Sequence, residues 1–457
     1  MAGIGFELRK VLKEDSILSL GKVYGYAALL SSGPWVISII AIIVVGFINV
    51  ATMGRMNDTV QFQIVVTYAI ALASSLIITG FVQLPFTRYI ADLIFAHQEE
   101  KVLPSYFGTI FMAWLAGIPF VVPAVIYVFP DEDIVFKLNV VSIFLVLCGV
   151  WISNILATSL KYYKGVLWAY VVSYGLIVLL SYMAGGNVDH LLTIFFLGNA
   201  LLFVWLFILI VKHYKGNKFL DFGFFLNKKF YWTLGIAGLF YNLGSWVDKF
   251  IFWYYPSTGY PVIGKLHASI LYDLPIFLAY LSIVPGMAIF FFRLEADFAQ
   301  KYELYYDVVR NDGTLEVIEH YRDEMIRTIR HAIREIIIIQ GIIDIILFMF
   351  APQIFSFLHI PQLYIGLFYI LTVGAMLQLG FMSVLAILYY LDRRREAMWL
   401  SILFFVLNAL FTFVSIKLGP PFYGYGYALS LLISFAWSLK VVRDEMEDLD
   451  YETFMLR

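Results

Sequence analysis

The sequence predicts an all-α membrane protein with twelve transmembrane helices. Hydrophobic residues make up 61% of the 457 residues and charged residues only 14%, whereas about a quarter of a soluble domain is usually charged. Most of the apolar runs are about 20–30 residues long, which suits helices that cross a bilayer with some tilt. Membrane β-strands are shorter and alternate polar with apolar residues, a pattern that is not seen here. The twelve spans are 23–50, 62–85, 106–129, 138–160, 166–185, 191–212, 231–253, 267–292, 332–351, 362–391, 397–418 and 422–441.

The distribution of basic residues predicts the orientation of these spans. If the N-terminus is placed in the cytoplasm, all but five of the 31 lysines and arginines fall on the cytoplasmic side. Lys249 lies within a span, and the other four, on the opposite side, are Arg55, Lys137, Lys265 and Lys417. Cytoplasmic loops of membrane proteins carry an excess of Lys and Arg. We therefore expect a multi-pass protein of the cytoplasmic membrane with both termini in the cytoplasm and no cleavable signal peptide.

Three short matches indicate that six spans are duplicated. Each match links a span, or the segment after it, to the one six positions later in the chain. The paired segments are 33–36 with 244–247 (Gly-Pro-Trp-Val and Gly-Ser-Trp-Val), 88–92 with 293–297 (Arg…Asp in both), and 162–168 with 389–399 (Tyr-Tyr, basic residues, Trp). Six spans return the chain to the same side, so the repeats are expected to be parallel, forming two pseudo-symmetric six-helix bundles.

These observations predict the domain organisation. The expected parts are an interfacial helix (1–22), a first bundle (23–212), a cytoplasmic linker (213–230), a second bundle (231–441) and a cytoplasmic tail (442–457). The loop 293–331 within the second bundle is expected to hold two amphipathic helices, broken at Asn311-Asp312-Gly313. Solvated helices and a docking platform for another protein are both compatible with this loop.

The seventh span carries two adjacent charges, Asp248 and Lys249. A charge near the bilayer centre costs about 2.5–3.5 kcal/mol on insertion scales, so such residues usually face a bundle interior or a water-filled cavity. Asn242, Ser245, Trp246 and Lys249 have i, i+3, i+4, i+7 spacing and share one helix face. This face is a candidate polar path through a membrane transporter and a plausible surface for sugars, since a tryptophan can stack on apolar sugar faces. The alternative is that Asp248 and Lys249 only hold the bundle together.

Other polar residues within spans extend the candidate path. Asp273 lies near the outer end of the eighth span and Asp344 deeper in the ninth. Trp35 occupies the position in the first span that matches Trp246 in the seventh. Interfacial hydration is the alternative for Asp273. Gln340 is interpreted as an interhelical hydrogen-bonding residue. The spans can bend at Gly33-Pro34, Pro85, Pro119, Pro123, Pro275 and Pro285.

The sequence does not predict an enzyme, a metal site or a cofactor. The segment Gly259–Lys265 matches the first seven positions of a phosphate-binding loop, but Leu266 stands where Ser or Thr would bind magnesium. Cys148 is the only cysteine, and the seven histidines lack metal-ligand spacing. Asp131-Glu132-Asp133 is interpreted as a solvated loop.

The opening residues resemble a known family. Met1–Lys10 (Met-Ala-Gly-Ile-Gly-Phe-Glu-Leu-Arg-Lys), followed by Tyr26 and Ser31–Val36, closely resembles the start of the PelG family of inner-membrane proteins, which belong to bacterial Pel exopolysaccharide export systems. The resemblance covers essentially the whole chain. It implies membership of the superfamily of multidrug, oligosaccharidyl-lipid and polysaccharide exporters, with two six-helix bundles around a central cavity.

The resemblance also implies a role in biofilm formation and a set of partners. These are a cytoplasmic Pel glycosyltransferase, a cyclic-di-GMP-binding Pel subunit and a further membrane Pel subunit. The implied substrate is a galactosamine-type polymer that becomes cationic on deacetylation. No nucleic acid is expected as a partner. The candidate docking residues on the loop 293–331 are Arg293, Asp297, Arg310, Arg322 and Arg327.

Three functions therefore stay open at this point. The first is a polysaccharide transporter or flippase. The second is an ion-coupled exporter of small cations, in which the intramembrane aspartates bind the coupling ion. The third is a membrane scaffold that anchors a polysaccharide synthase.

Overall fold

The computed structural model describes residues 25, 27–28, 32–71, 75–159, 163–226, 230–311 and 313–455. The predicted interfacial helix 1–22 lies outside them. The chain forms two compact units, which we call the N-unit (Gly33–Ser269) and the C-unit (Ile270–Arg457 together with residues 1–32). The predicted linker 213–230 lies inside the N-unit, and so does the helix that follows it, α11 (Trp232–Tyr254).

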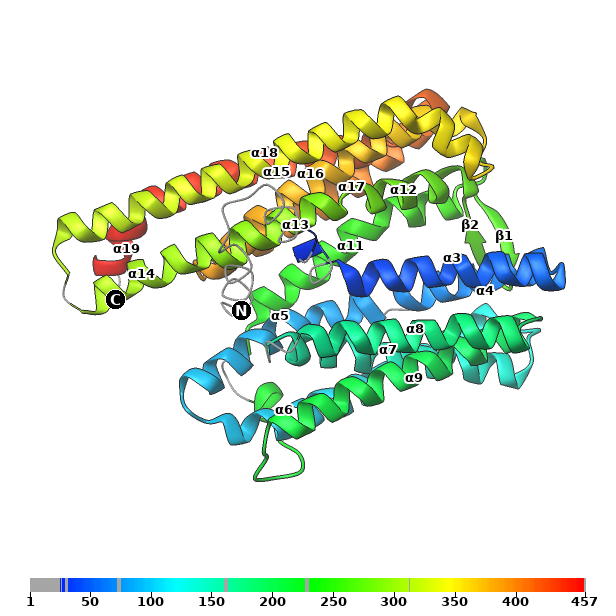
Figure 1. Cartoon of the computed structure of the whole chain (residues 1–457), viewed down its shortest axis with the longest axis horizontal. Helices are drawn as coiled ribbons and strands as arrows, with labels where there is room; N and C mark the ends of the chain where they lie inside the picture. The colour runs from blue at the N-terminus through cyan, green and yellow to red at the C-terminus, as the bar shows by residue number, and fades with distance from the viewer. Residues whose placement is uncertain are drawn as a thin grey trace. The chain divides into compact units, whose positions relative to one another are not determined.

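The N-unit consists of long apolar helices and one small hairpin (Figure 1). Its helices are α3 (Gly33–Met53), α4 (Met56–Ala71), α5 (Ser75–Phe95), η1 (Glu99–Lys101), α6 (Val102–Val128), α7 (Ile134–Ser159), α8 (Tyr163–Ala184), α9 (Val188–His213), α10 (Gly223–Leu226) and α11. Figure 1 shows α7, α8 and α9 side by side, and their inward faces contribute much of the hydrophobic core.

The C-unit is also helical and contains one very long helix. Its helices are α12 (Ile270–Ser282), α13 (Val284–Phe292), the π-helix η2 (Arg293–Phe298), α14 (Ala299–Arg310), α15 (Leu315–Phe357), η3 (Gln362–Tyr364), α16 (Ile365–Tyr390), α17 (Arg394–Leu418), η4 (Pro420–Phe422), α18 (Tyr425–Glu447) and α19 (Leu449–Met455). The predicted break at residues 311–313 is confirmed, since α14 ends at Arg310 and α15 begins at Leu315.

The length of α15 carries it beyond the bilayer. Its 43 residues extend about 65 Å at 1.5 Å per residue, roughly twice the thickness of the hydrocarbon core. Figure 1 shows α14 running back alongside the first half of α15, with α19 next to them. The predicted amphipathic helices of the loop 293–331 thus correspond to α14 and the first half of α15.

One helix lies at the centre of each unit. In their most apolar stretches, α7 is 61% buried and the segment containing α16 is 67% buried. Both helices are apolar around their whole circumference, with Lys137 the only charged residue in α7 and none in α16. Such helices are stable when they are surrounded by others. They correspond to the fourth and tenth predicted spans, six positions apart, as a parallel repeat requires.

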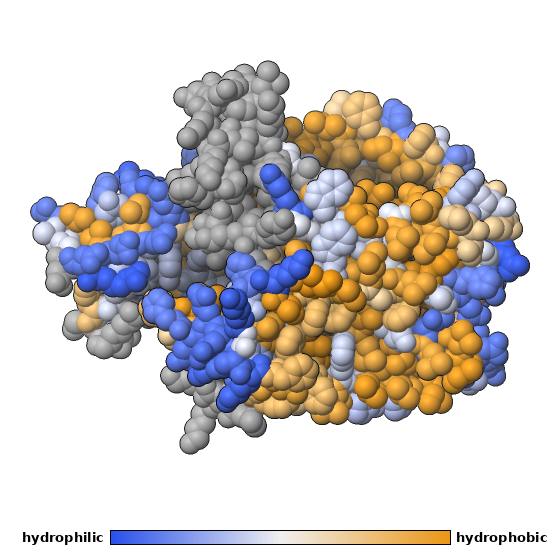
Figure 2. Space-filling model, turned by 60° about the horizontal axis from the view of Figure 1, so that its bottom comes forward, coloured by the Kyte–Doolittle hydropathy of each residue, from blue (hydrophilic) through white to orange (hydrophobic). Residues whose placement is uncertain are grey.

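Among the described residues, ten helical segments are long and apolar enough to cross a membrane. Two of the twelve predicted spans are not among them. The span 62–85 is divided between α4 and α5, and the span 231–253 coincides with α11, whose charges lower its hydropathy. On the face shown in Figure 2, apolar side chains fill a broad middle zone and hydrophilic ones gather toward the ends. The fold is that of an all-α multi-pass membrane protein, and the number twelve stays a prediction.

A two-stranded antiparallel hairpin follows α11. It pairs β1 (Tyr260–Ile263) with β2 (Leu266–Ala268). Gly264 has a φ of +54° at the turn, and a side chain there would also meet the carbonyl of Val128. The segment that partly matches a phosphate-binding loop is therefore a turn between two strands, whereas such a loop joins a strand to a helix.

Candidate functional site

The charges Asp248 and Lys249 of α11 form a buried ion pair. Asp248 is 0% exposed and Lys249 is 3% exposed. The ammonium nitrogen of Lys249 lies 3.2 Å from a carboxylate oxygen of Asp248 and donates a 2.8 Å hydrogen bond to the carbonyl of Ser245. It also lies 5.4 Å from the ring centroid of Trp246, within range of a cation–π contact. Neighbours on the same helix thus supply part of the compensation of these charges.

Several residues of the predicted polar face of α11 contact one another, and another part of this face meets a second helix. Lys249 contacts both Ser245 and Trp246, and Trp246 stacks on Phe250. Asn242, one turn earlier, donates to the carbonyl of Gly238 and lies against Gly80 of α5. Asn242 therefore lies at the contact between α5 and α11 in this conformation.

Glycines allow α5 and α11 to touch along their backbones. A Cβ atom added at Gly238 would lie 2.2 Å from the carbonyl oxygen of Gly80, and one at Gly80 would lie 2.3 Å from Nδ2 of Asn242. Small residues at helix contacts are the usual means by which membrane helices approach closely. This contact fixes the position of α11, and hence of its charges, within the N-unit.

We expect Gly238→Ala to destabilise the protein. Overpacking a close contact costs about 1–3 kcal/mol, which exceeds the gain of up to about 1 kcal/mol from replacing a helical glycine by alanine. Thermal unfolding of the purified protein in detergent measures the change. The matched control is Gly175→Ala in α8, where an added Cβ meets nothing within 4 Å. Equal unfolding temperatures for Gly238→Ala and the native protein would contradict the close contact.

A second buried carboxylate, Asp344 of α15, lies in the C-unit. It is 3% exposed, and its Oδ1 accepts a 2.7 Å hydrogen bond from Gln340 one turn earlier. Its other oxygen, Oδ2, is buried and has no hydrogen-bond partner among the described residues. A buried polar atom without a partner is costly and calls for an explanation, and an ionisable residue within a membrane span is a candidate functional residue.

The surroundings of Asp344 include an interrupted helix. The eighth predicted span is divided at Ile283 into α12 and α13, with Pro285 at the start of α13. This interruption leaves carbonyls at the end of α12 without regular helical partners, and Gln340 donates 3.0 Å to one of them, that of Ser282. The interpretation of Gln340 as an interhelical residue is thus confirmed, and the helix is interrupted two residues before Pro285. Irregular backbone beside an intramembrane carboxylate is a common feature of transporter sites.

The remaining two candidate path residues are less enclosed. Trp35 is half-buried near the start of α3, and Asp273 is half-buried in the first turn of α12. An acid in the first turn interacts favourably with the helix dipole, which gives Asp273 a structural role as well.

The Arg and Asp of the predicted repeat form an ion pair in both units, in the α-helix α5 and in the π-helix η2. In the N-unit, Arg88 pairs with Asp92 at 3.2 Å, and Tyr231 donates to the same carboxylate. In the C-unit, Arg293 pairs with Asp297 at 2.6 Å and with Glu335 of α15 at 2.5 Å. Both are i, i+4 pairs, so the Arg and Asp that the two five-residue segments share make the same kind of contact in each.

The candidate docking residues divide into two groups. Arg293, Asp297 and Arg322 are engaged within the C-unit, with Arg322 bound to Asp450 of the α19 helix. Arg310 and Arg327 are exposed, and Arg310 also pairs with Asp307 on its own helix at 3.5 Å. Of the five candidates, only these last two offer side chains that are well placed to meet another protein.

The contact with α19 involves a tyrosine that the sequence analysis did not single out. Burial raises the pKa of the Tyr305 phenol well above its ordinary value. The hydroxyl therefore stays protonated, and it donates a 2.9 Å hydrogen bond to Asp450. No sequence signal pointed to this contact, because its two residues lie far apart in the chain.

Comparison with protein families identifies the chain. One family model, described as "PelG: Putative exopolysaccharide Exporter (EPS-E)", matches residues 1–454. The chain belongs to the PelG family. This confirms the resemblance of the opening residues, and it places the chain in a family of transporters, not of enzymes. Among curated proteins, the comparison finds no match.

Solved structures of MATE and MOP-superfamily transporters have the same fold as this PelG-family chain. An outward-facing MATE multidrug transporter is 15% identical, with a TM-score of 0.60 over 97% of this chain and 98% of its own. A MOP-superfamily transporter from Pyrococcus furiosus is 15% identical, with a TM-score of 0.60 over 93% and 96%. An inward-facing MATE transporter is 13% identical, with a TM-score of 0.54 over 93% and 95%. At sequence identities this low, the structural similarity shows a shared fold.

Proposed function

We propose that this PelG-family chain exports a Pel-type, galactosamine-containing exopolysaccharide across the cytoplasmic membrane, within a complex that makes and secretes biofilm polymer. The observation that carries the proposal is the match of an exopolysaccharide exporter family to residues 1–454. The transporter fold supports it, because a carrier for a polar chain needs an interior that can bind polar groups inside a bilayer.

The proposed architecture is twelve helices in two six-helix bundles around a central cavity, with both termini in the cytoplasm. The paired contacts Arg88–Asp92 and Arg293–Asp297 support a repeat. The central positions of α7 and α16 support it as well. The orientation is supported by the lysines and arginines, of which all but five fall on one side.

The proposed polymer path is built on Asp248, Lys249 and Asp344. Once the pair separates, the carboxylate of Asp248 accepts hydrogen bonds from sugar hydroxyls or amines, and the ammonium of Lys249 donates to hydroxyls. Trp246, which already stacks on Phe250 and lies over Lys249, offers an aromatic face for a sugar ring. Trp35, Asn242, Ser245 and Asp273 extend the path along the helices.

The proposed partners are the cytoplasmic Pel glycosyltransferase, the cyclic-di-GMP-binding Pel subunit and a further membrane Pel subunit. Direct coupling of synthesis to export calls for a docking surface on the cytoplasmic side. The exposed arginines Arg310 and Arg327 at the α14–α15 end of the C-unit supply positive charge for such a contact.

The test of the function is deletion of the chain from its host and its re-expression. We expect secreted galactosamine polymer to be lost on deletion and restored by the native chain, while the glycosyltransferase is still present at its normal level. A deletion strain that secretes the polymer at the native rate would overturn the proposal.

A second candidate function, the ion-coupled export of small cations, is favoured by the unpartnered Oδ2 of Asp344. A buried carboxylate oxygen in a membrane bundle is a natural ligand for a proton or a sodium ion. Purified protein in liposomes decides between the two functions. Uptake of a small organic cation driven by a proton or sodium gradient would favour the second, and no uptake would leave polymer export as the function.

A further inference from the structure

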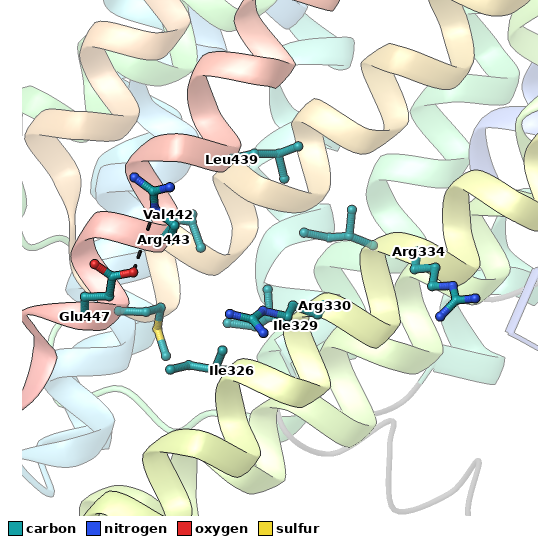
Figure 3. A pocket seen from close by; sticks show the side chains of 10 residues that line it. Ile326, Ile329, Arg330, Arg334, Leu439, Val442, Arg443 and Glu447 are labelled. Carbon is teal, nitrogen blue, oxygen red and sulfur yellow. Dashed lines mark ion pairs between the residues drawn. The ribbon is translucent and has the colours of Figure 1, made fainter.

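A groove lies between α15 and α18 of the C-unit, away from the candidate path residues. Its volume is about 360 Å³. Figure 3 shows side chains of both helices along its walls. The lining residues are Ile326, Ile329, Arg330, Ile333, Arg334, Leu439, Val442, Arg443, Met446 and Glu447.

The floor of the groove is apolar. Ile326, Ile329 and Ile333 line it from α15 at helical spacing, and Leu439, Val442 and Met446 line it from α18. None of these six side chains has a hydrogen-bond donor, and the thioether of Met446 is only a weak acceptor. A floor of this kind binds a hydrocarbon chain well and a polar peptide backbone poorly.

The apolar surface continues from the groove along the outside of α15. Arg330 and Arg334 are followed at helical spacing by Ile338, Ile342 and Ile345, which are 48%, 53% and 60% exposed. In a membrane protein, such an exposed stripe of isoleucines contacts lipid tails. The two arginines therefore lie where the lipid-facing surface ends and the polar part of α15 begins.

The groove carries excess positive charge. Three arginines face one acid, and Arg443 is already paired with Asp444 at 2.9 Å and with Glu447 at 3.8 Å. Arg330 and Arg334 have no ion pair with any of the described residues. In Figure 3, Arg330 reaches from α15 toward α18, whereas Arg334 points away along α15. Arg330 is thus the cation best placed to bind an anion at the groove.

We infer that this groove binds an anionic phospholipid. The phosphate lies on Arg330, with Arg334 adding positive charge one turn nearer the isoleucine stripe, and the acyl chains lie on the apolar floor and along that stripe. Guanidinium groups bind phosphate oxygens with strong, directional hydrogen bonds. Basic pockets between membrane helices commonly bind acidic lipid head groups on the cytoplasmic side. A soluble acidic peptide would complement the positive charge of the groove. It would not explain why the groove continues into the lipid-facing isoleucine stripe.

The experiment is a comparison of lipid retention by the purified full-length protein. Native chain is reconstituted with phosphatidylglycerol or phosphatidylcholine of the same acyl composition and extracted in mild detergent, and bound lipid is then counted by native mass spectrometry. We expect phosphatidylglycerol to be retained and phosphatidylcholine to be lost. Equal retention of both lipids would overturn the inference.

The variant that tests the site is the double substitution Arg330→Gln and Arg334→Gln. Loss of charge-assisted hydrogen bonds to the phosphate is expected to lower phosphatidylglycerol retention about tenfold. The matched control is Arg327→Gln, because Arg327 is an exposed arginine of the same helix that does not line the groove. Equal loss in the control, or no loss in the double variant, would overturn the inference.

Two further measurements keep the result interpretable. An unchanged unfolding temperature of the double variant shows that lost retention is not lost folding, and Arg330→Lys serves in its place if the double variant unfolds. Competition by inorganic phosphate tests whether the lipid tails matter. Displacement of phosphatidylglycerol by phosphate at equal concentration would mean that an anion alone fills the site, and would overturn the lipid assignment.

Discussion

Lys249→Met is expected to destabilise the protein by about 3–5 kcal/mol, because it removes a counter-ion from a buried carboxylate. Asp248 is fully buried, and the ammonium of Lys249 lies 3.2–3.3 Å from both of its oxygens. Methionine has nearly the volume of lysine, so the loss reflects charge more than packing. Thermal and denaturant unfolding in detergent, followed by tryptophan fluorescence, measures the effect.

The double variant Asp248→Leu with Lys249→Met distinguishes the cost of an unpaired buried charge from the cost of losing the whole ion pair. A protein often keeps its stability when a buried ion pair is replaced by apolar residues of similar volume. We therefore expect the unfolding temperature of the double variant to be close to that of the native protein and well above that of Lys249→Met. If the single variant is as stable as the native chain, the two charges do not depend on each other and the proposed pair is not the stabilising contact.

Asp344→Asn is expected to reduce polymer secretion about tenfold or more, the equivalent of losing one hydrogen bond to a charged group. The amide keeps the shape of the side chain and still accepts the hydrogen bond from Gln340. It removes the negative charge next to the interruption between α12 and α13. Secreted polymer at equal membrane levels of each variant is the measurement.

The control for Asp344→Asn is Ser383→Ala. Ser383 is also a buried polar residue of the C-unit, but among the described residues its hydroxyl donates to the carbonyl of Leu379 on its own helix. We expect this variant to secrete normally. Native secretion by Asp344→Asn would remove Asp344 from the proposed path, and equal losses in both variants would assign the effect to folding.

Some local features of the site could be predicted from residue spacing. The pairs Arg88–Asp92 and Arg293–Asp297 are four residues apart, the distance at which side chains meet on a helix. Gln340 and Asp344 have the same spacing, and they are hydrogen-bonded. The shared face of Ser245, Trp246 and Lys249 follows from the same periodicity.

Contacts between helices could not be predicted in this way. Asn242 lies against Gly80 of α5, and Gln340 reaches the carbonyl of Ser282 in α12. Periodicity defines which face of a helix is polar, but it does not say which other helix covers that face. The same limit applied to the docking residues, because only packing showed that Arg322 is bound to Asp450 while Arg327 is exposed.

The sequence by itself determined the class of this protein. Long apolar runs with few charges are stable only inside a bilayer, and the turn residues 311–313 interrupt the helical pattern because they favour non-helical backbone. Only the tertiary structure decided how the intramembrane charges are satisfied. Lys249 compensates Asp248, whereas Asp344 keeps one oxygen without a described partner. The cost of a buried charge depends on the atoms within a few ångströms, and folding brings those atoms together from distant parts of the chain.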